Sequence, residues 1–533
     1  MPVPPVTPAS FTFNSLRLNG VFNGFTYTGT NTSPILKLNF TAPIKHSSVV
    51  NSISFANLSG GTVNYSVGYE NNDSTVVIQP SAALAFLTKY AVTTTTSLES
   101  NSGGKLQTPI TVNLYTSLDS SRKFPAITDN ALMDLVQSQT FKYFYDFGHP
   151  VSGLARERNT SGDIVTSGGS GFGIMALITG VSRSFITRAQ ALTRLQTMVA
   201  FLKNTAQTFH GAYPHWLNGA TGVVIPFSTQ DNGADLVETS YLIEGLLCAR
   251  QYFNGTDATE TALRNDINII SDRVEWDWFR QGGQNALYWH WSPTLGFAIN
   301  MQIKGWNECL ITHVLARSST THSVPAAVYT NGWASNGSNS FLNGNTYYGY
   351  QLPLGSNLGG PLFFEHYSFM GINPTGLTDT YGNYTTQTKN HTLINYSYCK
   401  ANPQNYYGYS DSVWGLTASD IPNGYTASSP TNDVGVIAPT AALSSFPYTP
   451  TESMKALKFF YYVLGDKIFK QYGFVDAFKL SDPWVADSFL AIDQGPIIVQ
   501  IENYRSGLLW NLFTSCPEVK AGMKSLGFAA PYL

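Results

Sequence analysis

The sequence predicts a multidomain protein in which a β-sandwich precedes a larger all-α domain built as a closed ring of helical hairpins. Two observations lead to this prediction. Apolar residues alternate up to about residue 118, and they recur with helical spacing from Ile127 onward. A chain of 533 residues also exceeds what one hydrophobic core usually serves. We therefore expect a sandwich at 1–118, a linker at 119–126 and the helical domain at 127–533.

The first domain has the composition of short strands. The segments ILKLNF, TVNYSVGY, STVVIQP, YAVTTTT and ITVNLYT are rich in Val, Ile, Thr and Tyr, and turns rich in Asn, Gly and Ser separate them. Several such strands in about 110 residues are typical of a β-sandwich. The domain holds no cluster of candidate catalytic residues, so we expect a spacer or packing partner, with carbohydrate binding as the alternative.

The second domain shows about a dozen helical stretches joined by long loops rich in Gly, Trp, Tyr and Asn. This number of helices fits six hairpins closed into a ring, although no repeat is visible in the sequence. After the first helix, which follows Ile127, the predicted stretches lie near 171–180, 187–206, 235–252, 259–275, 304–316, 361–369, 388–401, 434–446, 451–463, 484–491, 496–513 and 517–526.

Composition excludes several classes of function. Charged residues make up only 12% of the chain, about half the usual share, whereas aromatic residues make up 14%. Such a surface suits uncharged, hydroxyl-rich ligands, because aromatic faces stack on sugar rings. A net charge of −3 without a basic stripe argues against nucleic acid as a partner. No apolar run reaches the length of a membrane span.

Cysteine usage and the first residues of the chain bear on location. Cys248, Cys309, Cys399 and Cys516 are far apart in the sequence, which predicts buried free thiols, with disulfides as the alternative, and no zinc or haem site. Residues 1–10 lack the charged and apolar segments of a signal peptide. The composition nevertheless favours an extracytoplasmic protein, periplasmic or anchored at the surface, and we expect a monomer without a cofactor.

The segment STQDNGADLVETSYLIEGLL carries a group of carboxylates. Asp231, Asp235 and Glu238 are spaced i, i+4 and i+7, which places them on one face if a helix includes all three. Three like charges on one face destabilise a helix unless a ligand or a reaction uses them. The alternative is that Asp231 caps the helix and Asp235 interacts with its positive end.

Two further carboxylates follow in the sequence. Glu308 opens an apolar helix in a segment with Trp276, Trp278, Trp289, Trp291 and Trp306, and desolvation by indoles would raise its pKa, as a general acid requires. A first-turn glutamate at a helix terminus is the alternative. Asp493 precedes a Gly-Pro helix start, where it could be a cap, and Glu502 could simply pair with Arg505 or another cation.

Other polar and aromatic residues fit the same kind of cleft. The run TSGGSGFG at 166–173 lacks the spacing of a phosphate loop, and a tight turn before a helix is the better interpretation. Glu157 next to two arginines could be a plain ion pair. The remaining candidates are Arg156, Arg158, His215, Trp216, His366, Trp414 and Asp420.

Several motifs of the predicted helical domain resemble those of a known family. DFGHPVSGLARERN, GADLVETSYLIEGLL, NECLITHVLA, HYSFMGINP, WGLTASD and AIDQGPIIVQIENYRSGLLW together resemble a bacterial family labelled "putative glucoamylase", which includes the endo-β-1,2-glucanases of glycoside hydrolase family 144. The resemblance covers about 127–530, and the first domain resembles bacterial Ig-like modules. It implies an (α/α)6 toroid and inverting hydrolysis of β-1,2-glucan or derived oligosaccharides. By motif, the acidic cleft residues fall on Asp231, Asp235, Glu238, Glu308 and Asp493.

From these observations we expect Glu308 as the acid and Asp235 or Asp493 as the base, with Asp231 and Glu238 holding the sugar or tuning pKa values. The family pattern leads us to expect a small or hydroxyl residue at position 365. The chain has Glu365 there, which predicts a narrowed or reshaped cleft. Alternatives are a glucoamylase-like or other glucan hydrolase, a polysaccharide lyase and a non-catalytic glycan-binding protein. The expected substrate contacts are Arg156, Trp216, Trp289, Trp291, Trp333, His366, Trp414 and Tyr504.

Overall fold

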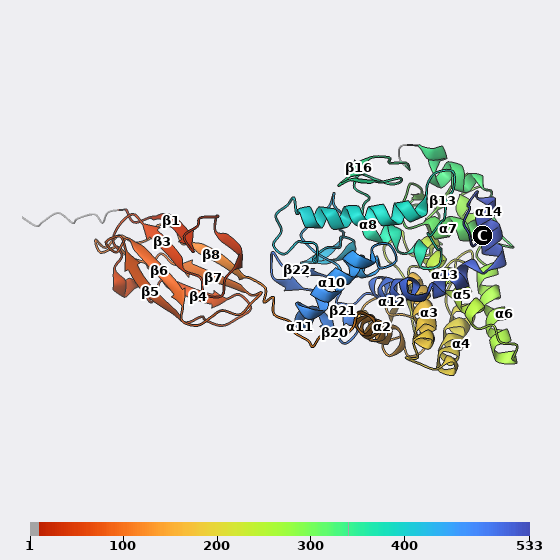
Figure 1. Cartoon of the computed structure of the whole chain (residues 1–533), viewed down its shortest axis with the longest axis horizontal. Helices are drawn as coiled ribbons and strands as arrows, with labels where there is room; N and C mark the ends of the chain where they lie inside the picture. Colours follow the sequence, from red (N-terminus) through yellow and green to blue (C-terminus); the bar gives the residue numbers. More distant parts are fainter. Residues whose placement is uncertain (1–9, 339–340) are drawn as a thin grey trace, which may run out of the picture. The chain divides into compact units, whose positions relative to one another are not determined.

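The computed structural model describes residues 10–338 and 341–533, which divide into two compact units (Figure 1). The first unit contains Met1–Ser121 together with Asn405–Gly408 and Lys479–Trp484. The second contains Arg122–Gln404, Tyr409–Phe478 and Val485–Leu533. Each unit is described by itself. Among the described residues, no helix is both long enough and apolar enough to cross a bilayer.

The first unit is built from two four-stranded sheets. One sheet has the strand order β1-β3-β6-β5 and the other has the order β2-β8-β7-β4, in which β2 and β8 run parallel. Apolar side chains of both sheets form one core. The elements are β1 Phe13–Leu18, β2 Thr26–Thr30, β3 Leu36–Phe40, α1 His46–Val49, β4 Ile53–Asn57, β5 Tyr65–Glu70, β6 Thr75–Pro80, β7 Lys89–Thr94 and β8 Thr111–Thr116.

The alternation in the sequence explains this core. Leu36, Leu38 and Phe40 are buried on β3, while Lys37 and Asn39 between them are partly exposed. A strand places successive side chains on opposite faces, so one face packs inward and the other meets solvent. The period-two pattern of the first domain therefore predicts its two-layered structure correctly.

The second unit is mainly helical, and two kinds of helix alternate along much of it. Helices α3, α5 and α12 are buried on almost every side, whereas α4, α6 and α10 bury mainly one stripe. The helices are α2 Asp129–Tyr145, α3 Ser167–Ser182, α4 Arg188–Asn204, α5 Leu236–Tyr252, α6 Ala258–Asp272, α7 Leu310–Ser318, α8 Tyr384–Ala401, α9 Pro439–Leu443, α10 Pro450–Tyr462, α11 Gly465–Ile468, α12 Ala491–Ser506, α13 Leu508–Thr514 and α14 Pro517–Ser525.

Short strands and turns connect these helices. The strands are β9 Ile164–Thr166, β10 Trp216–Asn218, β11 Val224–Ile225, β12 Ala234–Asp235, β13 Leu287–Tyr288, β14 His290–Trp291, β15 Gln302–Ile303, β16 Thr346–Tyr347, β17 Tyr350–Gln351, β18 Ala418–Ile421, β19 Gly424–Ala427, β20 Phe469–Lys470, β21 Gly473–Phe474, β22 Phe478–Lys479 and β23 Trp484–Val485. Strands β9 and β12 lead directly into α3 and α5 and so fix where these helices begin.

Two glycines let α3 and α5 pack closely. A Cβ atom on Gly171 would lie 2.1 Å from the carbonyl oxygen of Tyr241, and one on Gly245 would lie 2.2 Å from the carbonyl oxygen of Gly171. Real Cβ atoms do not approach so near, so only glycine fits at either place. The glycine-rich run at 166–173 is therefore a helix-packing surface, and the predicted tight turn before a helix is wrong because α3 already begins at Ser167.

Several helix boundaries also differ from the sequence prediction. The stretch at 361–369 forms two short 3₁₀ turns, Leu362–Glu365 and Ser368–Met370. The predicted helix at 484–491 begins as strand β23, and α12 starts at Ala491 and continues through Pro496. Asp493 consequently lies inside the first turn of α12, so it is not the residue that caps this helix.

Candidate active site

A cavity of about 470 Å³ lies in the helical unit. Seven aromatic side chains line it: Trp216, Phe227, Tyr241, Trp289, Phe363, Tyr367 and Tyr425. The carboxyl groups of Glu157, Glu238 and Glu308 share its wall with Arg158 and His215. Aromatic faces next to polar groups suit a neutral ligand with many hydroxyls, because the faces cover its C–H surfaces and the polar groups bind its hydroxyls.

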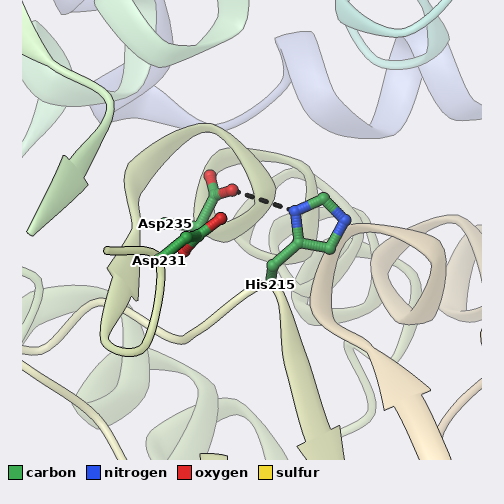
Figure 2. A group of neighbouring side chains, drawn as sticks. All are labelled: His215, Asp231 and Asp235. Atoms are coloured by element: carbon green, nitrogen blue, oxygen red, sulfur yellow. Dashed lines mark hydrogen bonds and ion pairs between the residues drawn. The ribbon is translucent and has the colours of Figure 1, made fainter. Parts of the chain in front are cut away.

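Asp235 caps the helix that carries part of this wall. Its Oδ1 accepts hydrogen bonds from the backbone N–H groups of Val237 at 3.0 Å and Glu238 at 2.9 Å, which fixes the start of α5. Its Oδ2 lies 3.1 Å from Nδ1 of His215 (Figure 2). Burial alone would raise the pKa of Asp235, but His215 and His290 outweigh it and lower that pKa. Asp235 is thus a fully buried, ionised anchor.

Asp231 approaches the same group from the turn before β12, not from helix α5, so the predicted single helical face is wrong for this residue. Its Oδ2 lies 3.6 Å from Nε2 of His290, and Oδ2 of Asp235 lies 3.7 Å from the same nitrogen. Burial and repulsion from Asp235 raise the pKa of Asp231. Ligand atoms of His215, Asp231 and Asp235 lie within 4.8 Å of one another, close enough to hold a metal ion (Figure 2).

His215 is the cation of this group. Burial disfavours its charged form, but the carboxylates of Glu238, Asp235 and Asp231 outweigh burial and raise the pKa of His215 to about 9. The imidazole is therefore charged at neutral pH. An imidazolium so placed compensates part of the negative charge at the cavity wall, and it competes with any metal ion for the same carboxylates.

Glu238 links the two closely packed helices. Its Oε2 accepts hydrogen bonds from the backbone N–H of Gly168 at 2.9 Å and from the hydroxyl of Thr166 at 3.2 Å, both at the beginning of α3. Burial and the nearby Asp235 raise the pKa of Glu238. The carboxyl group is thus held at the cavity wall by a neighbouring helix N-terminus, where negative charge is favoured.

Glu308 lies just before α7, and its side chain lines the cavity. The hydroxyl of Ser368 donates to its carbonyl oxygen, and Oδ1 of Asn307 accepts from the N–H of Cys309 at 3.0 Å, which together fix the turn. Burial, followed by repulsion from Glu238 and Asp235, raises the pKa of Glu308 to about 7. A carboxyl group with this pKa can hold a proton near neutral pH and give it up during a reaction.

The environment of Glu308 differs from the expected cluster of indoles. Of the five tryptophans in its segment, only Trp289 lines the cavity. Trp276 and Trp306 are buried elsewhere, and Trp278 and Trp291 pack together beside His210.

Asp493 lies in the first turn of α12. The preceding residues Leu490 and Ile492 line the cavity, whereas the side chain of Asp493 is buried. It is only 2% exposed, and its Oδ2 has no hydrogen-bond donor among the described residues. Burial and the neighbouring carboxyl of Asp476 raise its pKa well above the usual range. Asp493 therefore titrates together with another acid.

The chain is similar to several known proteins. Residues 300–517 match the family model described as "Putative glucoamylase", and residues 25–117 match the one described as "Bacterial Ig-like domain". A crystal structure from Bacteroides uniformis, described as a putative glucoamylase, is 54% identical with a TM-score of 0.76 and covers 77% of this chain and 100% of that chain. The chain belongs to the "Putative glucoamylase" family. The resemblance inferred from the sequence is thereby confirmed, as is that of the first domain to Ig-like modules.

Two relatives of this chain are described by a more specific activity. An endo-β-1,2-glucanase from Chitinophaga pinensis, solved with sophorotriose and glucose, is 50% identical with a TM-score of 0.75 and covers 76% of this chain and 100% of that chain. An exo-β-1,2-glucooligosaccharide sophorohydrolase from Parabacteroides distasonis is 44% identical over 421 residues, 75% of this chain. The match spans 58% of the length of that curated relative.

Three predicted substrate contacts lie in the interior of the protein. Trp333 is fully buried, stacks on His313 and donates to Oδ1 of Asn307 at 3.4 Å. His366 is 1% exposed and lies 3.0 Å from the hydroxyl of Ser445, and Trp414 is fully buried. The prediction that these side chains contact substrate is wrong, because none of them reaches the cavity.

Three further predicted contacts lie outside the cavity wall. The guanidinium of Arg156 stacks over the ring of Phe147, and Trp291 packs edge-on against His210. Tyr504 is 43% exposed near the C-terminal end of α12, and the helix rise of 1.5 Å per residue separates it from Asp493 at the other end. Of the predicted aromatic contacts, Trp216 and Trp289 line the cavity.

Glu365 does not reshape the cleft. It is fully buried, and its Oε1 accepts hydrogen bonds from Trp306 at 3.0 Å and Gln387 at 2.8 Å and lies 2.8 Å from Nδ1 of His391. The expectation that an extra carboxylate narrows the cavity is wrong, because this carboxylate organises the packing of α8 instead.

Sequence reasoning missed several residues of the site. Tyr241, Tyr367 and Tyr425 line the cavity, and the hydroxyl of Tyr241 is buried without a hydrogen-bond partner among the described residues. Asp476 and His290 contact the key carboxylates. Tyr241 was within reach of prediction, because it follows Glu238 at i+3 and so lies on the same helical face. Asp476 stands in an unremarkable loop, and only the fold brings it to Asp493.

Proposed function

We propose that this chain is a glycoside hydrolase that cleaves β-1,2-glucan, or oligosaccharides derived from it, by inverting acid–base catalysis. The observation that carries this proposal is a carboxyl group, Glu308, with a pKa of about 7 at the wall of an aromatic-lined cavity that is rich in further carboxylates. The names of the relatives from Chitinophaga pinensis and Parabacteroides distasonis support the β-1,2 linkage.

In the proposed reaction, Glu308 protonates the leaving glycosidic oxygen as the C1–O bond breaks. A water molecule forms the new bond to C1 from the opposite face, and its proton passes to the base, directly or through a substrate hydroxyl. One water is consumed and two hydroxyl groups are produced, so atoms and charge balance. Exchange with solvent then returns Glu308 to its protonated form and the base to its ionised form.

We assign the base to Asp493 rather than to Asp235. Oδ1 of Asp235 accepts from two backbone N–H groups and Oδ2 lies 3.1 Å from Nδ1 of His215, so this carboxylate is committed to capping α5 and to the imidazole. Asp493 retains an oxygen without a donor next to residues of the cavity wall. In this proposal Asp231, Asp235 and Glu238 set the local charge and hold the sugar.

We further propose an architecture for the helical domain and a location for the protein. The alternation of buried helices such as α3, α5 and α12 with more exposed ones supports an (α/α)6 toroid. A surface with few charges and an accompanying Ig-like module supports an extracytoplasmic location. We also propose that the protein acts as a monomer.

The decisive test is product analysis. Purified protein is incubated with linear β-1,2-glucan and, in parallel, with starch. We expect products only from β-1,2-glucan, with the new reducing end formed first as the α-anomer in proton NMR. A ladder of oligomers would indicate endo action and a single disaccharide exo action. Release from starch alone, an unsaturated product, or binding without cleavage would overturn the proposal.

Activity should be lost above a pH that is set by the pKa of Glu308. Because the folded protein raises the pKa of this acid to about 7, its protonated form predominates below that pH and is lost above it. We expect kcat/KM, which reports the free enzyme, to fall about tenfold per pH unit once the pH exceeds about 7. A profile that stays level far above this pH would remove Glu308 from the acid role.

Trp216 should contribute to substrate binding. Its indole lines the cavity, packs on Phe227 at 4.7 Å between ring centroids and has a buried Nε1 without an acceptor among the described residues. For Trp216→Ala we expect KM to rise about tenfold with a smaller change in kcat, since a lost stacking surface is worth about 1 kcal/mol or somewhat more. Trp278→Ala is the matched control, because that indole is outside the cavity wall. Equal effects of both variants would contradict the assignment.

A further inference from the structure

Strands β18 and β19 form a hairpin at the wall of the cavity. The strands are antiparallel, with Ala418 opposite Ala427 and Asp420 opposite Tyr425. Residues directly opposite each other, and residues two apart on one strand, lie on the same face of a sheet. These four residues therefore share one face. All of them except Asp420 line the cavity, so this face is turned toward the site.

Tyr425 is the one large side chain on this face of the hairpin. It is 48% exposed although it lines the cavity, whereas Tyr241 and Tyr367 in the same wall are 2% and 6% exposed. Ala427, two residues further along the strand, adds only a methyl group beside it. Much of the Tyr425 ring is thus open to a ligand, and an aromatic face of this kind covers the C–H surface of a sugar ring.

The hairpin needs support from the rest of the helical unit. Each of its strands has only four residues, and among the described residues no third strand joins the sheet. A hairpin of two strands is at best marginally stable alone in water. Contacts with other segments must therefore fix where the Tyr425 ring stands.

Asp420 supplies these contacts from the position opposite Tyr425. Its Oδ1 and Oδ2 each accept a hydrogen bond from Nη1 of Arg158 at 3.3 Å, and the hydroxyl of Ser488 donates to Oδ2 at 2.5 Å. Its backbone N–H donates to Oδ2 of Asp476 at 2.6 Å. Arg158 precedes β9, Asp476 follows β21 and Ser488 precedes α12, so the hairpin is joined to three segments far apart in the sequence.

Arg158 is itself held at the cavity wall. Its Nε donates to both carboxyl oxygens of Glu157, at 3.1 and 3.0 Å, and both residues line the cavity. Exposed ion pairs contribute little to stability, but Arg158 and Asp420 are both largely shielded from solvent and have several partners. Removal of the Asp420 side chain would leave the guanidinium and the Ser488 hydroxyl without this acceptor and would release the hairpin.

We propose that Tyr425 binds substrate by stacking its ring on a sugar unit in the cavity, and that Asp420 is a positioning residue that holds the hairpin and this ring in place. The inference rests on the proposed function, in which the cavity binds β-1,2-glucan or its oligosaccharides. It adds a sugar-binding residue that is separate from the carboxyl groups assigned as acid and base. A stacking contact stabilises the bound substrate and the transition state alike, so its loss should raise KM more than it lowers kcat.

Substitutions of Tyr425 test the stacking contact. For Tyr425→Ala we expect KM on β-1,2-glucan to rise about tenfold with kcat within about threefold of wild type. Tyr425→Phe keeps the ring and should keep KM within about threefold. Tyr504→Ala is the matched control, because that tyrosine is 43% exposed and lies outside the cavity wall. An unchanged KM in Tyr425→Ala, or equal losses in Tyr425→Phe and Tyr425→Ala, would overturn the stacking contact.

A double-mutant cycle tests the positioning role of Asp420. Asp420→Ala should raise KM about tenfold, whereas Asp420→Asn keeps an acceptor oxygen and should stay within about threefold. Because Asp420 acts through the ring, Asp420→Ala combined with Tyr425→Ala should be no worse than Tyr425→Ala alone. Losses that multiply to about 100-fold, or a fall in kcat with KM unchanged, would show that Asp420 acts otherwise. If Asp420→Ala does not fold, Ser488→Ala removes one donor to the same carboxylate and enters the same cycle.

Calorimetry distinguishes failure of this inference from failure of the proposed function. The glucose trisaccharides with β-1,2 and with α-1,4 linkages are titrated into Glu308→Gln, which prevents hydrolysis, and into the same variant with Tyr425→Ala. We expect only the β-1,2 trisaccharide to bind, with a Kd about tenfold higher when the ring is missing. Binding of the α-1,4 trisaccharide alone would overturn the proposed function. Equal affinities with and without the ring would overturn the contact, and binding of neither sugar would overturn both.

Discussion

Replacement of Glu308 by Gln is expected to lower kcat on β-1,2-glucan about 1000-fold, within the range that general acid catalysis contributes. The amide cannot protonate the glycosidic oxygen, whose departure as an alkoxide is unfavourable. KM should change little, because Gln has the same size and can still hydrogen-bond. Initial rates with purified, folded protein give both constants.

The leaving group offers a sharper test of the same substitution. An aryl β-glycoside whose phenol is acidic leaves without protonation, so Glu308→Gln should retain far more of its activity on that substrate than on glucan. Glu244→Gln, the buried acid away from the cavity, should lose little on either. A similar loss on both substrates would mean that Glu308 does not act on the leaving oxygen.

Replacement of Asp493 by Asn should produce a loss of comparable size, about 1000-fold in kcat, for a different reason. The water then has no group to accept its proton, while protonation of the leaving oxygen by Glu308 remains intact. Aryl glycosides with acidic phenols should therefore be cleaved as poorly as glucan by this variant. Circular dichroism and thermal unfolding establish that the variant is folded.

Small anions distinguish a missing base from a damaged fold. Azide needs no deprotonation to attack C1, so its addition should restore bond cleavage in Asp493→Asn and leave Glu308→Gln unchanged. Asp235→Asn is the informative comparison, because the structure commits Asp235 to capping α5 and to the imidazole of His215. A larger kcat loss in Asp235→Asn than in Asp493→Asn would transfer the base assignment to Asp235.

The general architecture was accessible from periodicity alone. Strands such as β3 alternate buried and partly exposed residues, and the change of period near Ile127 marks the start of the helical domain. Helix boundaries were less accessible, because they depend on contacts that are distant in sequence. Asp231 appeared to belong to the helix of Asp235, yet β12 pairs with β14, and α5 begins only after that strand.

The site was predictable where chemistry is local in the sequence, as with Glu308 beside Asn307 at the start of a helix. It was not predictable where burial decides the role. From the sequence, Trp333 and Trp414 are candidate substrate contacts like Trp216, but in the structure they are buried in the core. Glu365 has the charge of a cleft residue, but N–H donors from Trp306 and Gln387 and the imidazole of His391 surround it in the interior.

The close contact of α3 and α5 at Gly171 and Gly245 has an implication for how this protein can change over time. These helices carry Gly168 and Glu238, whose hydrogen bond joins the two sides of the cavity wall. Any side chain at either glycine would force the helices apart and pull that bond open. The freedom of the site to adapt to new sugars is thus limited by two positions that touch no ligand, while the loops that supply Phe227 and Trp289 are free of this constraint.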